Sequence, residues 1–263
     1  MPEFTSWRSY QQFAASVTRE RRFFRSPDQA AFIDAVLSNA GTRHHAIQPG
    51  ETLWRAQIGH DWYEDELGVE IPVPFPVERM KPKRDRAKEG RANPKGIPYL
   101  YTASQRETAI AEARPRMGAY ISIAEFTVVK PLTIVNCTST AAFSPLYFEE
   151  PGPSERAAAN WKAIDNAFSR LVTTDDHLAD YVPTQILAEA FRHDGLHGVA
   201  YRSSLGPPHN IVLFDLDAAV VSQRILCKVQ SVTLVTEDQQ PVPRPERITA
   251  QRGVTRKEEN EHK

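Results

Sequence analysis

The stretch that organises this chain is residues 90–112, which read GRANPKGIPYLYTASQRETAIAE. The beginning of the stretch is rich in Gly, Asn and Pro and predicts a loop, whereas residues 99–102 suit a short buried strand. Ser104 and Glu107 have the spacing of a capping box, in which each side chain bonds the other residue's backbone N–H. We therefore expect a helix to begin at Ser104 and to end before Pro115.

Three polar side chains stand at fixed positions in this stretch. Arg91 falls in the predicted loop, Tyr101 in the strand and Glu112 in the helix. The helix residues around Glu112 are mostly small and apolar, which allows close packing against a sheet. A carboxylate in this setting is either exposed on the outer face of the helix or held in a polar cleft. The periodicity of the sequence leaves both options open.

The composition is that of an ordinary globular protein without a strong charge. The 263 residues are 41% hydrophobic and 25% charged, with a formal net charge of −1. We expect one large domain or two small ones and no broad nucleic-acid binding. No apolar run is long enough to span a bilayer, and the N-terminus does not resemble an export signal. Cys137 and Cys227 lack ligand or disulfide spacing, which is typical of a reducing cytoplasm.

Helical and strand patterns are interleaved along the chain without a regular βαβ alternation. The predicted class is therefore mixed α+β, with a small central sheet flanked by helices. Helical patterns occur in residues 7–17, 26–37, 154–171 and 186–191, and strand patterns in 53–58, 120–128, 132–136, 199–203 and 211–214. Residues 225–235 supply a last apolar stretch.

Two segments before the organising stretch leave open questions. In residues 53–58, Arg55 lies between apolar neighbours, so it either forms a structural ion pair or binds a ligand. Residues 59–95 are rich in Pro and in charge, and they predict a long surface loop that covers a site. Cations outnumber carboxylates in residues 79–95. This excess of cations indicates either a solvated face or a basic rim that attracts a phosphate-bearing ligand.

The common cofactor and metal motifs are missing from the sequence. There is no G-x-G-x-x-G after a strand, no Walker loop and no G-x-S-x-G elbow, which weakens the dehydrogenase, NTPase and α/β-hydrolase interpretations. His193 and His197 are separated by Gly195 and lack the glutamate of H-E-x-x-H, so no metal site is expected. Cys137 has strand-like neighbours and is expected to be a buried, unreactive thiol.

The residues described so far resemble the RES domain, the toxin part of bacterial RES–Xre toxin–antitoxin systems, named for arginine, glutamate and serine. The resemblance covers roughly residues 45–215, and Arg91, Tyr101 and Glu112 have the spacing of the family pattern. Ala92 stands where the family often has an aromatic residue, which alters the expected shape of the pocket but not its charge. The matching segments are Leu53-Trp54-Arg55-Ala56, Gly90-Arg91-Ala92-Asn93 with Gly96, Tyr101, Thr108-Ala109, Ala111-Glu112, Pro183-Thr184-Gln185, Gly198-Val199-Ala200-Tyr201-Arg202-Ser203-Ser204 and Asn210.

The resemblance implies a fold related to ADP-ribosyltransferases and an enzyme that cleaves the nicotinamide–ribose bond of NAD. NAD is then the substrate, with inorganic phosphate or water as the acceptor, and no separate cofactor is implied. The resemblance also implies a partner, an Xre-type antitoxin, in the bacterial cytoplasm. The expected division of the chain is an N-terminal helical extension over residues 1–44, the RES domain over 45–235 and a flexible polar tail over 236–263.

The residues of the family pattern can be given roles on physical grounds. Cleavage leaves positive charge on the ribose, so the carboxylate of Glu112 would stabilise an oxocarbenium-like transition state. Tyr101 offers an aromatic face to the nicotinamide ring, and Arg91 and Arg55 would bind the diphosphate and the attacking phosphate between them. Ser203 can donate to a phosphate or ribose oxygen, but no adjacent histidine makes it a nucleophile. The predicted residues for NAD binding are Arg55, Asn93, Ser204 and Asn210.

Several alternatives remain open from the sequence. The spacing after Tyr201 selects Ser203 as the site serine, although Ser204 lies beside it. An ADP-ribosyltransferase acting on a macromolecule would share the cleft, and an open basic loop over residues 79–95 would favour it. A non-catalytic NAD- or nucleotide-binding module is the other alternative, against which Glu112 argues, because binding an anionic dinucleotide needs no carboxylate at the ribose. The oligomeric state is undetermined, and a homo-oligomer is compatible with the sequence.

Overall fold

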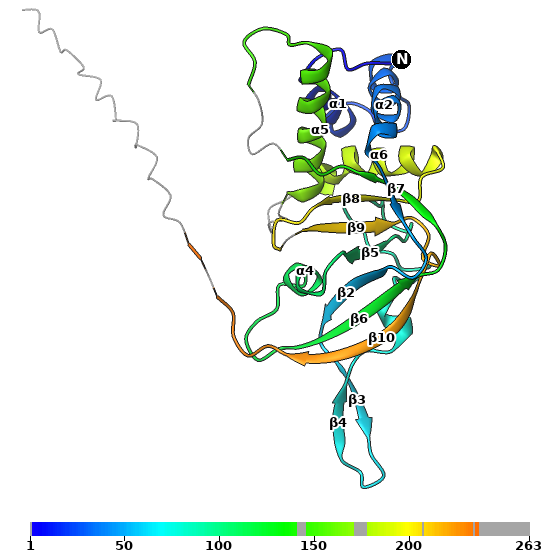
Figure 1. Cartoon of the computed structure of the whole chain (residues 1–263), viewed down its shortest axis with the longest axis vertical. Coiled ribbons are helices and arrows are strands. Elements are labelled where there is room, and N and C mark those ends of the chain that lie inside the picture. The colour runs from blue at the N-terminus through cyan, green and yellow to red at the C-terminus, as the bar shows by residue number, and fades with distance from the viewer. Residues whose placement is uncertain (1, 141–145, 171–177, 207, 234, 237–263) are drawn as a thin grey trace, which may run out of the picture. The chain divides into compact units, whose positions relative to one another are not determined.

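The computed structural model describes residues 2–140, 146–170, 178–206, 208–233 and 235–236. By their contacts the residues form two units, Met1–Val232 and Thr233–Lys263. The fold and the candidate site lie in the first unit (Figure 1). The predicted tail, 236–263, lies outside the described residues except for its first residue. No helix in the described ranges has the length and apolar character that crossing a membrane requires.

An eight-stranded sheet forms the centre of the first unit. Its strands are β1 (His44–Ile47), β2 (Thr52–Ile58), β5 (Leu100–Ala103), β6 (Tyr120–Val128), β7 (Leu132–Asn136), β8 (Gly198–Arg202), β9 (His209–Leu213) and β10 (Ala219–Lys228). They lie in the order β1-β7-β8-β9-β5-β2-β6-β10, and β7 and β8 are parallel while the other neighbours are antiparallel. The mixed α+β prediction is confirmed, but the sheet is larger than the small one expected.

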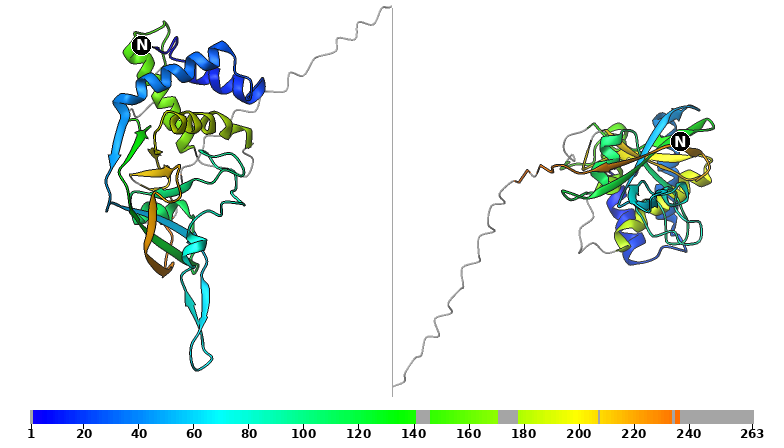
Figure 2. Two further views of the ribbon diagram at one scale, coloured as in Figure 1. Left: turned by 90° about the vertical axis from the view of Figure 1, so that its right-hand side faces the viewer. Right: turned by 90° about the horizontal axis from the view of Figure 1, so that it is seen from below.

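Four helices gather beside the β7–β8–β9 half of the sheet, as Figures 1 and 2 show. They are α1 (Ser9–Arg19), α2 (Pro27–Ala40), α5 (Pro153–Ser169) and α6 (Val182–His193). Their apolar side chains share one core with one face of the sheet, where Val199 and Val212 are fully buried. Helix α2 begins as predicted, with Pro27 in its first turn and a capping box between Ser26 and Gln29. The N-terminal helices are thus packed on the same core as α5 and α6.

The sheet is weakly joined in its middle, between β5 and β2. These two strands share a single register pair, Trp54 with Ala103, whereas β5 pairs with β9 along its whole length. The short helix α4 (Arg106–Glu112) packs against β2 beside this junction. A second core lies on the other side of the sheet and includes Phe75 and Met80. The weak junction leaves space for polar groups at the centre of the fold.

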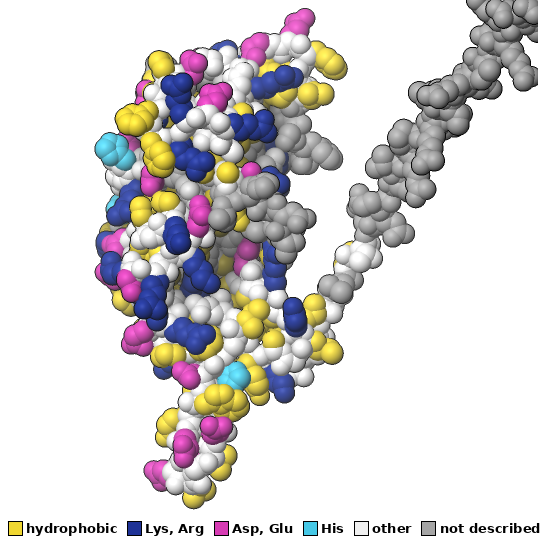
Figure 3. All heavy atoms as spheres, turned by 180° about the vertical axis from the view of Figure 1, so that it is seen from behind, with side chains coloured by type: hydrophobic (Ala, Val, Ile, Leu, Met, Phe, Trp, Pro, Cys, Tyr) yellow, Lys and Arg dark blue, Asp and Glu magenta, His cyan; other side chains and the backbone are white. Residues whose placement is uncertain are grey.

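The prediction of a long loop over residues 59–95 is wrong for its first part. Strands β3 (Asp61–Glu64) and β4 (Glu70–Val73) form a separate two-stranded hairpin, followed by the short helix α3 (Val77–Met80). The hairpin projects from the body of the molecule (Figures 1 and 2). It carries exposed apolar side chains, among them Trp62 and Leu67. Figure 3 shows acidic and hydrophobic side chains on the surface of its lower end. Each strand has only four residues, too few to show a clear period in the sequence.

The predicted capping box at the start of α4 is also wrong. The helix begins at Arg106 with Gln105 as its N-cap, and no side chain caps it. The hydroxyl of Ser104 instead donates to the backbone carbonyl of His209 at 3.1 Å. Ser104 therefore extends the pairing of β5 with β9, a long-range contact that local sequence does not reveal. The helix ends at Glu112, before Pro115 as predicted.

Candidate functional site

A pocket of about 160 Å³ opens at the weak junction of the sheet, between β2, β5 and α4. We call it the first pocket. The polar side chains that line it include Arg55, Tyr101, Glu112 and Asn210, and Tyr201 also contributes to its wall. The organising stretch therefore meets the predicted partners from β2 and β9 in one concave site.

Glu112 is the best-anchored group of the first pocket. Its Oε1 atom accepts hydrogen bonds from Ser203 Oγ and from Asn210 Nδ2, each at 2.7 Å. Its Oε2 atom accepts no hydrogen bond from the described residues. Of the two options that the sequence left open, the polar cleft is therefore correct. One carboxylate oxygen is fixed by the protein, and the other is available to a ligand.

Of the two neighbouring serines, Ser203 is the one that contacts Glu112. Its Oγ atom accepts from the backbone N–H groups of Leu205 and Gly206, at 3.2 and 3.1 Å. These bonds fix the hydroxyl as acceptor and direct its proton to the carboxylate. Ser204 instead donates to the backbone carbonyl of Ser169 at the end of α5, at 2.5 Å. Ser204 thus anchors the turn. Neither serine belongs to the lining of the first pocket, and Ser203 acts there through Glu112.

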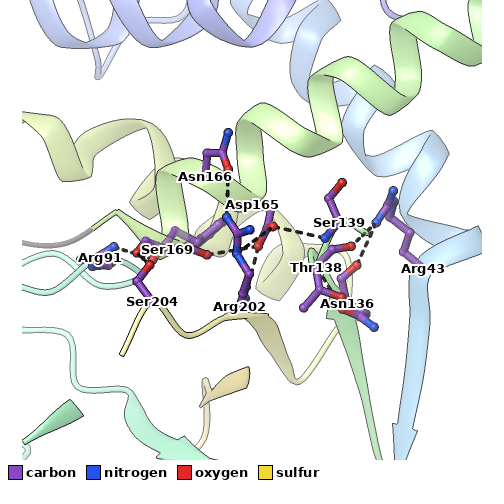
Figure 4. A network of polar contacts seen from close by, with 11 residues as sticks. Arg43, Arg91, Asn136, Thr138, Ser139, Asp165, Asn166, Ser169, Arg202 and Ser204 are labelled. Carbon is purple, nitrogen blue, oxygen red and sulfur yellow. Dashed lines mark hydrogen bonds and ion pairs between the residues drawn. The ribbon is translucent and has the colours of Figure 1, made fainter. Parts of the chain in front are cut away.

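A buried carboxylate on α5 holds the segment that leads into this turn (Figure 4). Asp165 is fully buried, and its Oδ1 accepts from the backbone N–H of Arg202 at 3.2 Å and from Ser169 Oγ at 3.1 Å. Its Oδ2 accepts from Ser139 N at 3.2 Å and lies 3.8 Å from Arg202 Nε. Asp165 was not among the predicted site residues, because only the tertiary fold brings α5 against the end of β8.

Tyr101 and Asn93 hold the loop of the organising stretch in place. The Tyr101 hydroxyl donates to Asn93 Oδ1 at 2.7 Å and accepts from the backbone N–H of Ala92 at 2.9 Å. The Asn93 Nδ2 group donates to the carbonyls of Lys88, Pro94 and Ile97. Asn93 was predicted to bind NAD, but its side chain is buried and committed to these bonds. Ala92 is fully buried, so the small residue at this position fits its site.

Two residues of α6 complete the support of this loop. Gln185 Nε2 donates to the carbonyls of Gly90 and Asn93, at 2.9 and 3.1 Å. Thr184 Oγ1 donates to the carbonyl of Arg91 at 2.6 Å. The Pro183-Thr184-Gln185 segment lies in the first turn of α6. Its hydrogen bonds therefore connect this helix with the site loop. The match of this segment to the family pattern indicated that it has a role in the site. The sequence did not indicate which residues it contacts.

Arg55 lies between the first pocket and a second one. Its Nη1 atom donates to the carbonyl of Tyr101 at 2.8 Å, while its buried Nε atom has no hydrogen-bond partner. No described carboxylate lies within ion-pair distance of it, so the structural ion pair considered for Arg55 is not formed. Burial lowers the pKa of the guanidinium, as expected when a cation is desolvated without a counterion. An anionic ligand would supply the missing partner.

The second pocket has a volume of about 290 Å³ and shares Arg55 and Tyr101 with the first. Its remaining wall comes from residues 82–83 and 86–90 and from Asn93, Pro98 and Tyr99. The basic segment predicted as a rim therefore forms part of a pocket wall. Arg55 and Tyr101 are therefore common to the walls of both pockets, and the two pockets adjoin at these side chains.

Arg91 does not line either of these pockets. Its Nη1 atom donates to the carbonyl of Phe168 at the end of α5, at 2.6 Å (Figure 4). Burial raises the pKa of the nearby Tyr201 hydroxyl, the positive charge of Arg91 lowers it, and the negative charge of Glu112 raises it. Tyr201 is thus the neighbour that Arg91 and Glu112 have in common. The structure brings Arg91 near the site, but not into the lining of the first pocket.

Tyr201 is the pocket residue that the sequence reasoning missed. It is buried, it lines the first pocket and its ring stacks on Phe168 at a centroid distance of 5.5 Å. Its register partner on β9 is Asn210, so both side chains point to the same face of the sheet. The signal that could have found it is the two-residue alternation between Tyr201 and Ser203.

Metal and thiol chemistry find little support in the described part of the chain. Among those residues, no group of three or more His, Cys, Asp or Glu side chains could hold a metal ion. Cys137 is fully buried, and burial raises the pKa of its thiol, as predicted for an unreactive cysteine.

The fold and the site define a mixed α+β protein with a carboxylate-centred pocket at the weak junction of its sheet. The family model described as RES domain matches residues 52–237, and the chain belongs to the RES domain family. A comparison with curated proteins found no match. Among solved structures, the chain is similar to one from the crystal structure of the M. tuberculosis MbcT-MbcA toxin-antitoxin complex. The TM-score is 0.39, with 17% sequence identity, over 73% of this chain and 91% of that chain.

Proposed function

We propose that this protein cleaves the nicotinamide–ribose bond of NAD, and that it acts as the toxin of a toxin–antitoxin pair. The observation that carries the proposal is the anchoring of Glu112 in the first pocket by Ser203 and Asn210. Two neutral donors keep the carboxylate in one orientation, and they leave its second oxygen for the substrate. Family membership supports the same reading.

The chemistry requires stabilisation of positive charge. The bond from the ribose carbon to the pyridinium nitrogen breaks, and its electron pair leaves with nicotinamide, which becomes neutral. The oxocarbenium-like ribosyl group left behind would be stabilised by the negative charge of Glu112. An oxygen of phosphate or water then forms the new bond. Phosphate yields a ribosyl 1-phosphate, and water yields ADP-ribose after loss of a proton.

The two adjoining pockets suggest an orientation for the dinucleotide. The nicotinamide ribose would lie in the first pocket beside Glu112, and the diphosphate would pair with Arg55 at the junction of the two pockets. This assignment gives the buried Nε of Arg55 the acceptor that it lacks in the protein. The adenosine half would extend into the second pocket, along the wall formed by residues 82–83 and 86–90.

Tyr101 and Arg91 would support the substrate in different ways. Tyr101 lines both pockets while its hydroxyl is held by Asn93, so its ring is a preorganised wall for the nicotinamide nucleoside. Arg91 would reach the attacking phosphate only after its guanidinium releases the carbonyl of Phe168. Its proposed role in phosphate binding therefore includes a side-chain rotation on substrate binding.

The partner and the cellular location follow from the family and not from any surface of this chain. We propose that an Xre-type antitoxin holds the protein inactive in the cytoplasm, as expected for the toxin part of such a pair. Mixing the purified protein with its antitoxin should abolish NAD cleavage.

Product identification tests the function directly. The purified protein is incubated with NAD in the presence and absence of phosphate, and the products are identified by mass. Release of nicotinamide with a ribosyl 1-phosphate only when phosphate is present would select phosphorolysis, and ADP-ribose in both reactions would select hydrolysis. Intact NAD after long incubation with folded protein would refute both.

The transferase alternative is examined in the same experiment. An ADP-ribosyltransferase would release nicotinamide only when a macromolecular acceptor is added, and the acceptor would gain the mass of ADP-ribose. An open basic loop over residues 79–95 would favour the transferase, but basic residues of this segment form part of the wall of the second pocket. This arrangement provides a wall for a small anionic substrate, so cleavage without an acceptor is the expected result.

A further inference from the structure

The second pocket carries more positive charge than the diphosphate of NAD requires. Lys83, Arg86 and Lys88 line it together with Arg55, and Glu89 is the single carboxylate of its lining. Arg55 lies at the junction with the first pocket, where the diphosphate is proposed to bind. The other three cations lie in the irregular segment after α3, which forms the outer wall.

These three cations are largely available to a ligand. Lys83 and Lys88 form no ion pair with a described carboxylate, and Arg86 pairs only with its exposed neighbour Asp85 at 3.4 Å. An exposed pair of this kind contributes little free energy. One oxygen of the Glu89 carboxylate, Oε1, accepts from Gln185 Nε2 at 3.1 Å. The pocket therefore presents cations whose charge the protein itself does not neutralise.

The position of these cations relative to the bound dinucleotide decides which group of the dinucleotide they would contact. If the nicotinamide ribose lies at Glu112 and the diphosphate at Arg55, the adenosine ribose reaches the second pocket. Proteins that bind NAD commonly place a free carboxylate at the ribose 2′-hydroxyl, whereas those that bind NADP place cations there. In this pocket three cations outnumber the single carboxylate, one oxygen of which is already bonded to Gln185.

We propose that the preferred substrate is NADP, the dinucleotide with an additional phosphate on the adenosine ribose, and that Lys83, Arg86 and Lys88 bind this phosphate. A phosphomonoester carries between one and two negative charges near neutral pH, which several cations can neutralise together. The inference rests on the proposed cleavage reaction and specifies its substrate.

A competition experiment measures the preference. NAD and NADP are added together in equal concentration, and the loss of each is followed by mass. Charge-assisted hydrogen bonds to a phosphate predict that NADP is consumed about 10- to 100-fold faster at low salt. The preference should decrease as salt is added, because the three side chains are exposed to solvent. Equal rates, or faster loss of NAD, would overturn the inference and leave the proposed cleavage reaction intact, whereas loss of neither dinucleotide would refute the reaction itself.

Matched variants assign the effect to these residues. The triple variant K83Q/R86Q/K88Q should lower the rate with NADP far more than the rate with NAD, so that their ratio approaches one. The control is R84Q, because Arg84 belongs to the same segment but pairs with Asp217 and does not line the pocket. An unchanged ratio in the triple variant, or an equal loss in R84Q, would contradict the assignment.

A binding measurement keeps the test independent of catalysis. Adenosine 2′,5′-bisphosphate and AMP differ in the additional phosphate, and calorimetry compares their affinities for the unmodified protein. We expect the bisphosphate to bind at least about tenfold more tightly. Equal affinities would refute a 2′-phosphate site even if the dinucleotides are cleaved.

Discussion

The hydroxyl of Ser203 lies 2.7 Å from Oε1 of Glu112, and this hydrogen bond joins two residues that are 91 positions apart in the sequence. It connects the end of α4 with the turn after β8. The hydroxyl in turn accepts two backbone N–H groups, so its proton can point only toward the carboxylate. The bond fixes the orientation of the carboxylate that the proposed reaction requires.

The E112Q variant tests the charge of the site without changing its shape. The amide oxygen of Gln can still accept from Ser203 and Asn210, so folding and NAD binding should be preserved. Loss of the negative charge should lower kcat by about 10²- to 10³-fold, measured as nicotinamide release. Glu107 lies on the same helix and is exposed, so E107Q is the control and should keep full activity. Wild-type turnover in E112Q would remove Glu112 from the mechanism.

The two serines provide a second matched pair. S203A removes a hydrogen bond to a charged group, which is worth about 1.5–3 kcal/mol, so kcat should fall by about 10- to 100-fold. S204A removes the bond to the carbonyl of Ser169 and should leave kcat within about threefold of wild type, since this hydroxyl does not contact Glu112. The kcat values of both variants, measured by steady-state kinetics, show which of the two serines supports catalysis. A larger loss in S204A would show that the pattern-based choice of Ser203 is incorrect.

Asp165 tests how strongly the α5–β8 network holds the fold. In D165N one carboxylate oxygen becomes an NH₂ group. This group would face either the N–H of Ser139 or the donors of Ser169 and Arg202. Two donors cannot pair, so the free energy of unfolding should fall by about 2–4 kcal/mol, measured by urea denaturation. D217N is the control, because Asp217 forms its ion pairs at the surface and should cost less than about 1 kcal/mol.

Gly90 is predicted to be intolerant of any side chain. A Cβ atom at this position would lie 2.5 Å from the Tyr101 hydroxyl and 2.7 Å from Asn93 Oδ1. The free energy of unfolding of the G90A variant should therefore be about 1–3 kcal/mol lower than that of the wild type. At Gly41 a Cβ atom would meet no atom within 4 Å, and G41A should be close to neutral. Because G90A and Y101F disturb the same contact, the double variant should lose less stability than the sum of the two single variants.

The buried Tyr10 and Tyr201 and the partly buried Tyr101 predict a loss of stability in alkali. Burial raises the pKa of Tyr10, Tyr101 and Tyr201 above the ordinary value. Above about pH 10 the unfolded chain loses these protons while the folded protein keeps them. The unfolded state then binds fewer protons, so the free energy of unfolding falls as pH rises. Urea denaturation at increasing pH should show full stability below about pH 10 and a steady decline above it, with a smaller slope in Y10F.

The sequence by itself determined the elements whose signals are local. Ser26 and Pro27 mark the start of α2, because a first-turn proline acts within the helix terminus itself. The apolar alternation of residues 120–128 likewise predicts β6. The RES family pattern, which depends on residue types and spacing, also selected Arg55, Tyr101, Glu112 and Asn210, all of which line the first pocket.

Only the tertiary structure decided the contacts between distant segments. Ser104 has the spacing of a helix cap, but the nearby carbonyl of His209 takes its hydroxyl. Asn93 was predicted to bind NAD, yet its side chain is used by Tyr101 and by three backbone carbonyls. Each side-chain donor and acceptor pairs with whichever partner the fold brings within reach, and for these residues the partner lies on another strand or across a loop. The direction of Glu112 was decided in the same way, by donors that come from β9 and from the turn after β8.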